Sequence, residues 1–151
     1  MDLFNIREME VRDIDAVMSI ENQCFVSPWG KEDILRELND NQFANLLVAT
    51  INDFVVGYID YWVTFDSATI CQIAVVPGYR RQSIGTKLLK EMFKDCFVKK
   101  AKTITLEVRN SNSNAISFYE MHGFKTYLEK VNYYTNGENA LYMMKEVDIN
   151  G

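Results

Sequence analysis

The chain has 151 residues, of which 48% are hydrophobic and 25% charged, the balance of an ordinary soluble globular protein. This length predicts one domain, residues 1–151, with a full hydrophobic core. The net charge of −5 argues against general nucleic-acid binding and suits a cationic substrate. Because the sequence shows no secretion signal and no apolar run of about 18 residues, we expect a cytoplasmic protein without membrane contact.

The three cysteines, Cys24, Cys71 and Cys96, are far apart and form no Cys-x-x-Cys pair. This spacing indicates neither a zinc site nor a disulfide framework, so no metal is expected. We expect each thiol to pack as a small reduced hydrophobe. Cys71 is a minor candidate for an acyl-enzyme nucleophile, because the sequence offers it no evident basic partner.

The beginning of the chain predicts a strand over residues 3–9 and a helix over residues 12–22, where apolar residues recur at helical spacing. A second helix is expected over residues 31–38. The loop between the two helices contains Phe25 and Trp29, large apolar side chains at positions where polar residues are usual. They either fill the space between the helices or line an acceptor pocket.

A meander of three strands is expected next, over residues 46–51, 54–65 and 67–76. Asn52-Asp53 is a turn pair and predicts a hairpin between the first two strands. Gly57 lies inside the second strand and indicates a bulge.

A strand, a basic loop and a helix follow one another in residues 72–99. The apolar run over residues 73–76 meets a turn at Pro77-Gly78, then a polar loop over residues 80–86, and then an amphipathic helix. Backbone N–H groups at the start of that helix stabilise an anion. The segment therefore predicts a phosphate site, with a plain basic loop as the alternative.

The side chains of this loop favour a diphosphate. Arg80 and Arg81 add charge-assisted hydrogen bonds, and Gly85 has no Cβ, so a phosphate can approach its backbone. The spacing matches neither the Gly-x-Gly-x-x-Gly dinucleotide fingerprint nor a P-loop.

The loop resembles the acetyl-coenzyme A signature of the GNAT superfamily of N-acetyltransferases, Arg/Gln-x-x-Gly-x-Gly/Ala, with Arg80 first and Gly85 last. Ser83 stands where that family usually has its first glycine, and it suits the site only with a negative φ. The resemblance implies acetyl-CoA as co-substrate, its pantetheine arm along the strand and its diphosphate on the loop. The implied binding residues are Ile73, Ala74, Val75, Arg80, Arg81, Gln82, Ser83, Ile84, Gly85, Thr86, Asn112 and Tyr119.

Residues 103–108 are rich in β-branched side chains and predict a strand parallel to residues 71–76, because a helix crosses between them. Where two such strands diverge at their carboxyl ends, ligands bind in α/β sheets. Asn112 is then expected to cap a short helix that ends at Gly123.

The last two strands are expected over residues 124–131 and 139–144, as an antiparallel pair with a turn at Asn136-Gly137. The expected fold class is α/β (α+β). The resemblance implies the GNAT acyl-CoA N-acyltransferase fold, a mixed, mainly antiparallel seven-stranded sheet with a central splayed parallel strand pair and about four flanking helices.

Glu107 and Tyr119 are the candidate catalytic residues. A carboxylate can take the proton of an attacking ammonium, and a phenol can protonate the leaving thiolate. The segment Asn-x-x-Ala-x-x-Phe-Tyr-Glu-x-x-Gly-Phe from Asn112 resembles the ribosomal-protein alanine acetyltransferases, whose matching glutamate and tyrosine hold these roles. The alternatives are an ion pair of Glu107 with Arg109 or a lysine, and a core packing role for Tyr119.

Aromatic residues mark the expected acceptor side. Tyr133 and Tyr134 would face opposite ways in a strand, which leaves at least one for a substrate. The Phe-x-x-Pro-Trp loop of Phe25 and Trp29 and the Asn-Tyr-Tyr segment resemble those that border the acceptor peptide in N-terminal acetyltransferases. His122, in the last helical turn, is expected to be partly cationic rather than catalytic.

The resemblance runs from about Ile6 to Lys145 and is nearest to the ribosomal-protein-alanine N-acetyltransferases (RimI type). It implies that the partner is a small-subunit ribosomal protein, whose N-terminal alanine is acetylated. An α-amino group near pKa ~8 is partly neutral at pH 7, unlike lysine near ~10.4, which suits a modest carboxylate base. The alternatives are acetylation of a polyamine or other small amine, and a non-catalytic acyl-CoA-binding module.

Overall fold

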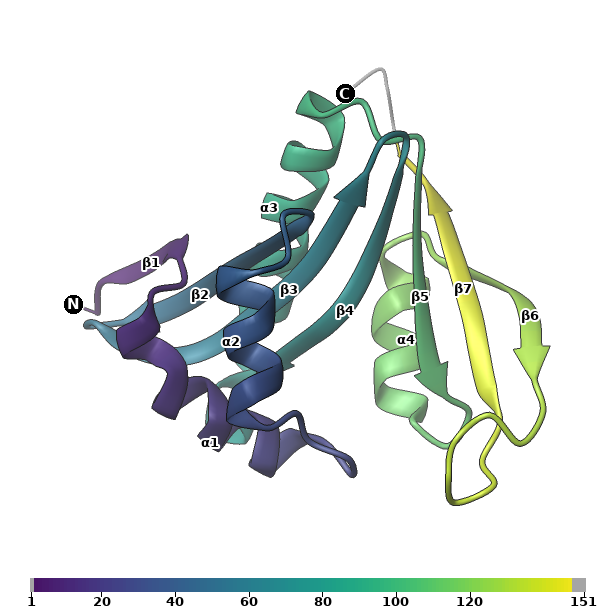
Figure 1. The fold of residues 1–151 in the computed structure, drawn as a ribbon, viewed down its shortest axis with the longest axis horizontal. Helices are drawn as coiled ribbons and strands as arrows, with labels where there is room; N and C mark the ends of the chain where they lie inside the picture. Colours follow the sequence, from purple (N-terminus) through teal and green to yellow (C-terminus); the bar gives the residue numbers. More distant parts are fainter. Residues whose placement is uncertain (1, 148–151) are drawn as a thin grey trace.

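In the computed structural model, which describes residues 2–147 without the side chain of Arg81, seven strands form one sheet between two layers of helices (Figure 1). The sheet order is β1-β2-β3-β4-β5-β7-β6. The strands are β1 (Phe4–Glu8), β2 (Ala44–Ile51), β3 (Phe54–Thr64), β4 (Ser67–Val75), β5 (Thr103–Arg109), β6 (Lys125–Lys130) and β7 (Ala140–Glu146). The helices are α1 (Ile14–Cys24), α2 (Lys31–Asn39), α3 (Ile84–Val98) and α4 (Ser113–Met121), with 3₁₀ turns η1 (Val11–Asp13) and η2 (Pro77–Gln82).

The parallel pair β4–β5 is splayed, as predicted. Pairing runs only from Ser67 opposite Thr103 to Thr69 opposite Thr105, so it involves the start of β4 and not the predicted residues 71–76. The first residues of two parallel neighbours pair with each other, because the crossover helix returns the chain to the end of the sheet at which the earlier strand began. Directly after this pairing, the register between β3 and β4 shifts and leaves Cys71 as an extra residue. Such a bulge bends its strand, which accounts for the separation of β4 from β5.

The β2–β3 hairpin is confirmed, with Asn52 and Asp53 both at positive φ, 51° and 70°. The predicted irregularity at Gly57 is confirmed too, since the register shifts there and leaves Val56 extra in β3. A Cβ on Gly57 would lie 3.0 Å from the carbonyl oxygen of Ala74. Glycine therefore leaves room for the Ala74 carbonyl of β4, which a side chain at this position would crowd.

The core consists of one apolar cluster on each face of the sheet. The helices α3 and α4 cover one face, and α1 and α2 cover the other (Figure 1). The fully buried side chains of the first cluster include Ile59, Ile84, Leu88, Leu89, Met92 and Ile104, and those of the second include Val17, Ile20, Ile34, Val48 and Tyr58.

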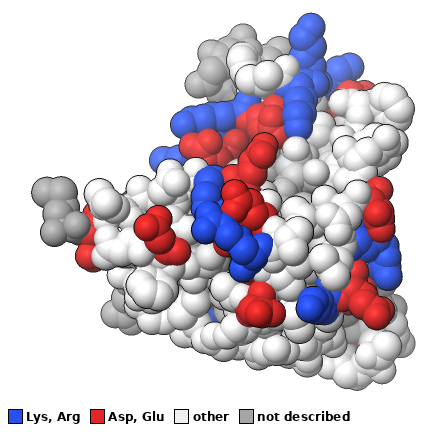
Figure 2. Space-filling view, turned by 60° about the vertical axis from the view of Figure 1, so that its left-hand side comes forward, with Lys and Arg blue, Asp and Glu red and all other residues white. Residues whose placement is uncertain are grey.

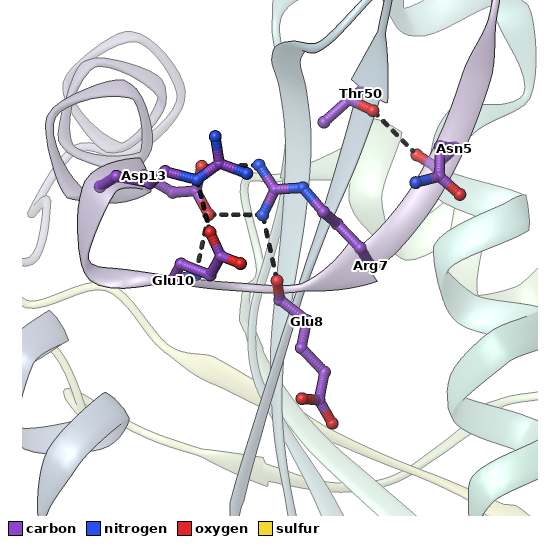
Figure 3. A network of polar contacts seen from close by, with 7 residues as sticks. Asn5, Arg7, Glu8, Glu10, Asp13 and Thr50 are labelled. Carbon is purple, nitrogen blue, oxygen red and sulfur yellow. Dashed lines mark hydrogen bonds and ion pairs between the residues drawn. The ribbon is translucent and has the colours of Figure 1, made fainter.

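A forked ion pair fastens β1 to the start of α1 (Figure 3). Arg7 donates from Nη1 and Nη2 to the two carboxylate oxygens of Asp13, at 2.7 and 2.9 Å. Asp13 Oδ2 also accepts the backbone N–H of Glu10, at 2.8 Å. The hydrogen bond from Arg7 lowers the pKa of Asp13, which is almost fully buried.

Acidic and basic side chains are interspersed on the face drawn in Figure 2, and neither sign forms one extended patch there. Among the described residues, no helix combines the length and the apolar character needed to cross a membrane.

Candidate active site

The splayed strands bring two connections toward the same end of the sheet (Figure 1). The strand β4 runs on to Val75 and leads through η2 into α3, while β5 runs on to Arg109 and leads into α4. Beyond Thr69, β4 pairs with β3 on one side and no longer with β5 on the other. The backbone of Ile73, Ala74 and Val75 is thus a strand edge to which an extended ligand can add.

The start of α3 has free backbone donors. The N–H groups of Ile84, Gly85 and Thr86 belong to the first turn and therefore lack helical acceptors. The Ser83 side chain does not cap the helix and supplies no acceptor either. The preceding segment is the 3₁₀ turn η2, where an open polar loop was predicted, and Tyr79 N–H donates to the Val76 carbonyl at 2.8 Å. The segment for which an anion site was predicted is thus an uncapped helix N-terminus approached by a tight turn.

Ser83 adopts φ 60° and ψ 24°, in the left-handed region. The condition stated for Ser83, a negative φ, is therefore not met, because the chain turns sharply between η2 and α3 at this point. A left-handed residue other than glycine costs about 1–2 kcal/mol. This conformation explains why glycine is usual at that position of the acetyl-CoA signature.

The other predicted ligands of the diphosphate differ in their surroundings, and Arg80 is held by protein partners. Arg80 donates from Nε to the Val75 carbonyl at 3.1 Å and from Nη2 to Cys24 Sγ at 3.3 Å. Gln82 is exposed, and the side chain of Arg81 lies outside the described part of the structure. A Cβ on Gly85 would lie 3.4 Å from the ring of Phe118. The start of α3 therefore packs closely against α4 at Gly85.

The expectation of a partly cationic His122 is wrong. Burial, followed by the charges of Lys90 and Lys145, lowers the pKa of His122. Its Nε2 lies 3.0 Å from Thr86 Oγ1, within hydrogen-bond distance. The neutral ring thus links the end of α4 to the first turn of α3. Asn112 caps α4 as predicted, since its side-chain oxygen accepts the N–H of Ala115 at 3.2 Å.

Glu107 projects from β5 on the face opposite the core cluster, because the residues before and after it, Leu106 and Val108, are buried in that cluster. Its carboxylate accepts a hydrogen bond from Lys130 Nζ at 2.9 Å, and its side chain is 28% exposed. The expected alternative, an ion pair between Glu107 and a lysine, is therefore present. Glu107 also raises the pKa of the neighbouring Tyr133.

Tyr119 is buried on the face of α3 and α4. Its ring packs edge-on against Phe118 and Phe124, with ring centroids 5.4 and 5.6 Å apart. Burial raises the pKa of Tyr119, so the phenol stays protonated at neutral pH. Tyr119 thus has the core packing role that was the alternative to catalysis. Its phenol is also in the protonated form, which can donate a proton.

Tyr133 and Tyr134 lie in the β6–β7 loop and not in a strand. Their rings meet edge-on at 5.1 Å. The Arg109 guanidinium stacks 3.9 Å from the centre of the Tyr134 ring, which is half-buried, whereas Tyr133 is 48% exposed. Tyr133 is therefore the tyrosine that faces solvent.

An ion pair that the sequence analysis missed supports this loop. Arg109 donates from Nη1 to Glu138 at 2.8 Å and from Nη2 to Ser27 Oγ at 3.4 Å. Hydrogen bonds from Ser111, Asn136 and Arg109 lower the pKa of Glu138 to about 2. The network ties β5 to the α1–α2 loop. Its members are far apart in the chain, so no local pattern reveals it.

Phe25 and Trp29 are half-buried against the apolar cluster beneath α1 and α2. The backbone N–H of Trp29 donates to Glu21 Oε2 at 3.3 Å. Both side chains thus fill space next to the helices, and Trp29 also lines a surface pocket shared with Glu37, Phe43 and Trp62.

Known proteins resemble this chain over nearly all of its length. Residues 14–124 match the acetyltransferase (GNAT) family. The chain is 40% identical to a candidate ribosomal protein bS18-alanine N-acetyltransferase of Bacillus subtilis, over 91% of this chain and 92% of that protein. It is 33% identical to the ribosomal protein bS18-alanine N-acetyltransferase of Escherichia coli K12, over 91% and 94%.

Solved structures share the fold. The ribosomal-protein-S18-alanine N-acetyltransferase of Escherichia coli superposes with a TM-score of 0.88 at 30% identity, covering 99% of this chain and 97% of that one. A PaiA N-acetyltransferase of Thermoplasma acidophilum, solved with coenzyme A, gives a TM-score of 0.81 at 21% identity, with coverage of 95% and 99%. The seven-stranded sheet with its splayed pair is therefore the arrangement found in these transferases.

Proposed function

Since this chain belongs to the GNAT acetyltransferase family, and is therefore an acetyl-CoA-dependent acyltransferase, we propose that it acetylates the N-terminal α-amino group of a protein. The acceptor we propose is the N-terminal alanine of a small-subunit ribosomal protein, in keeping with the relatives at 40% and 33% identity. The observation that carries the chemistry is the partly exposed Glu107 carboxylate beside the splayed strands, next to the exposed ring of Tyr133.

The residues at the end of β4 fit acetyl-CoA, which supplies the acetyl thioester. The free N–H groups of Ile84, Gly85 and Thr86 suit the diphosphate, and the unpaired edge at Ile73, Ala74 and Val75 suits the amides of the pantetheine arm. We include in this site the remaining residues of the acetyl-CoA signature, Arg80, Arg81 and Gln82, together with Asn112 and Tyr119. Ser83 takes part as the residue that turns the chain into α3, because its left-handed backbone does not meet the condition for a phosphate donor. A backbone N–H near Val75 is suited to polarise the thioester carbonyl.

Glu107 and Tyr119 serve as base and acid in this proposal. Glu107 takes the proton of the acceptor ammonium, directly or through one water, after its ion pair with Lys130 opens. Tyr119, which burial keeps protonated, gives its proton to the departing thiolate. The amine and the carboxylate meet on the exposed face of β5, where the acceptor can enter from solvent.

The acceptor peptide lies, in this proposal, between the β6–β7 loop and the α1–α2 loop. Tyr133 offers an exposed ring and hydroxyl, while Tyr134 is held by Arg109. Phe25 and Trp29 support the opposite loop, which Arg109 contacts through Ser27. The backbone of a peptide can then contact both loops, whereas a small amine would contact only the base, Glu107.

The test is release of free CoA thiol from acetyl-CoA with two peptide acceptors. One peptide carries a free N-terminal alanine, and the other has the same sequence with a blocked N-terminus and an added lysine. We expect turnover of the first alone, because the α-amine is the less protonated at pH 7. Turnover of the lysine peptide alone, or only of free polyamines, would contradict N-terminal acetylation while leaving the transferase intact.

A further inference from the structure

Three side chains with metal-ligating atoms meet beneath α2, and none of them belongs to the proposed active site. They are Glu37 from α2, Asp60 from β3 and Cys71 from β4, and their ligand atoms all lie within 4.8 Å of one another. Glu37 and Asp60 are buried and Cys71 is half-buried. Cys71 is the bulged residue of β4, where the register between β3 and β4 shifts. Three elements far apart in the chain therefore converge on one point.

Asp60 meets no hydrogen-bond donor at this point, and its close polar neighbour is another carboxyl group, Glu37. Its side chain is fully buried, and neither carboxylate oxygen has a hydrogen bond within the part of the chain that the structure describes. Glu37, in contrast, accepts from Trp62 Nε1 at 2.6 Å and from Asn41 Nδ2 at 2.7 Å. Burial of a bare carboxylate costs several kcal/mol unless a cation or a proton neutralises it. Asp60 therefore requires one of the two.

No described basic side chain forms an ion pair with this cluster, although Arg36 lines the adjoining pocket beside Glu37. Among residues 2–147, no ion pair involves Glu37 or Asp60. A third buried carboxylate, Glu21, lies on the same face and is bonded to the hydroxyl of Tyr58 and to Gln72 Nε2. Burial and the neighbouring Glu37 raise the pKa of Asp60 to about 9. In the metal-free protein Asp60 therefore holds a proton at neutral pH, and a cation that fits takes the place of that proton.

We propose that Glu37, Asp60 and Cys71 bind a divalent zinc-type cation. Two carboxylate oxygens and one sulfur suit zinc, which accepts oxygen and thiolate ligands, whereas calcium and magnesium prefer oxygen alone. Ligands in a tetrahedral zinc shell lie roughly 3.5 Å apart, as the bond lengths of about 2.0–2.3 Å imply. Side-chain shifts of about 1 Å therefore close the cluster. Binding displaces the proton of the Cys71 thiol and any proton held by Asp60.

The cluster has a route from solvent. Glu37 and Trp62 line a surface pocket together with Trp29, Asp33, Arg36, Asp40 and Asn41, so the Glu37 side of the cluster borders space open to solvent. A water in this pocket can complete the zinc shell. A bound ion would fix α2 to β3 and β4, and α2 follows directly on the loop that contains Phe25 and Trp29. The site is independent of the proposed acetyl transfer.

The test is metal binding by the purified chain after chelator treatment and removal of the chelator. We expect calorimetric titration with Zn²⁺ to show one equivalent bound, and Co²⁺ to give the near-ultraviolet absorption of a thiolate ligand. Asp60→Asn and Cys71→Ser should each weaken Zn²⁺ binding at least about 100-fold, since each removes a direct ligand. Cys71→Ser should also abolish the Co²⁺–thiolate band. Circular dichroism establishes that both variants fold.

Matched controls separate this site from general charge and thiol effects. Asp33→Asn removes a carboxylate that lines the same pocket, and Cys24→Ser removes the other half-buried thiol. Both should bind Zn²⁺ as the parent chain does. Absence of saturable Zn²⁺ binding in the parent chain, or equal binding by Asp60→Asn and Cys71→Ser, would overturn the proposal and leave a proton on Asp60.

Discussion

The strands that part after Thr69 and Thr105 carry carboxylates in opposite situations. On the β3–β4 side, Asp60 is fully buried without a hydrogen-bond partner. On the β5 side, Glu107 is partly exposed and paired with Lys130 at 2.9 Å. The two groups have the same chemistry, and only the surroundings differ.

The difference in exposure and pairing decides whether each carboxylate affects turnover or stability. A partly exposed ion pair contributes about 0–1 kcal/mol, so an incoming ammonium can replace Lys130 on Glu107 at little cost. A buried carboxylate has no such freedom, because ionising it without a cation costs several kcal/mol. We therefore expect substitutions on the β5 side to change turnover, and substitutions on the β3–β4 side to change stability or ligand binding.

Glu107→Gln should have the largest effect, a loss of turnover of roughly 100-fold or more, as removal of a general base causes. The amide keeps the shape of the side chain, so acetyl-CoA binding should be unchanged. CoA-thiol release and calorimetric titration measure the two quantities. Glu129→Gln, at an exposed position of β6, is the matched control. An unchanged rate would remove Glu107 from the mechanism.

Tyr119→Phe should lower kcat by about 10-fold or more while KM for the peptide stays nearly constant. The loss is smaller than for Glu107 because a thiolate of pKa ~8.5 is already a fair leaving group. The ring contacts with Phe118 and Phe124 are retained, so thermal stability should hold. Tyr127→Phe, an exposed tyrosine of β6, serves as control. Equal kcat values for both variants would assign Tyr119 to packing alone.

Asp60→Asn should stabilise the metal-free protein by roughly 1–3 kcal/mol at pH 8. Folding raises the pKa of Asp60 to about 9, so the folded state holds a proton that the unfolded state releases near pH 4. The stability due to this proton is full below pH 4 and is lost as the pH rises toward 9. Urea unfolding with chelator present should therefore show a flatter pH dependence in the variant. A parallel decline in both proteins would contradict the raised pKa.

Ser83→Gly should have the smallest effect, a gain in stability of roughly 0.5 kcal/mol. Relief of the left-handed serine outweighs the added freedom of glycine in the unfolded chain. Turnover should remain within about two-fold, because the backbone donors of α3 stay in place. In the control Ser117→Gly, within α4, urea unfolding should show a loss instead. A loss at Ser83 as well would mean that its hydroxyl, not its backbone, decides stability.

Local patterns were sufficient for most of the fold. Turn residues located the β2–β3 hairpin at Asn52-Asp53, and the predicted helix cap at Asn112 was confirmed. The helix that crosses between β4 and β5 indicated that these two strands are parallel. The register of that pair was not predictable, because the Cys71 bulge depends on how β4 packs against β3. Whether Ser83 would keep a negative φ was left open for a similar reason, since the turn angle follows from where α3 packs.

Candidate residues were found where chemistry and position coincide along the chain. Glu107 was found as a charge within an apolar strand, yet the choice of Lys130 over Arg109 as its partner depended on the β6–β7 pairing. The Arg109–Glu138 network and the cluster around Asp60 could not be found at all. Their members approach one another only in the folded sheet.

The sequence by itself determined the elements, the family resemblance and the candidate base and acid, because hydrophobic period, turn residues and motif spacing are local properties of the chain. The tertiary structure decided which carboxylate is exposed and paired and which is buried and bare. That outcome depends on strands and helices far apart in sequence, since burial and partners, not residue type, set the cost of a charge.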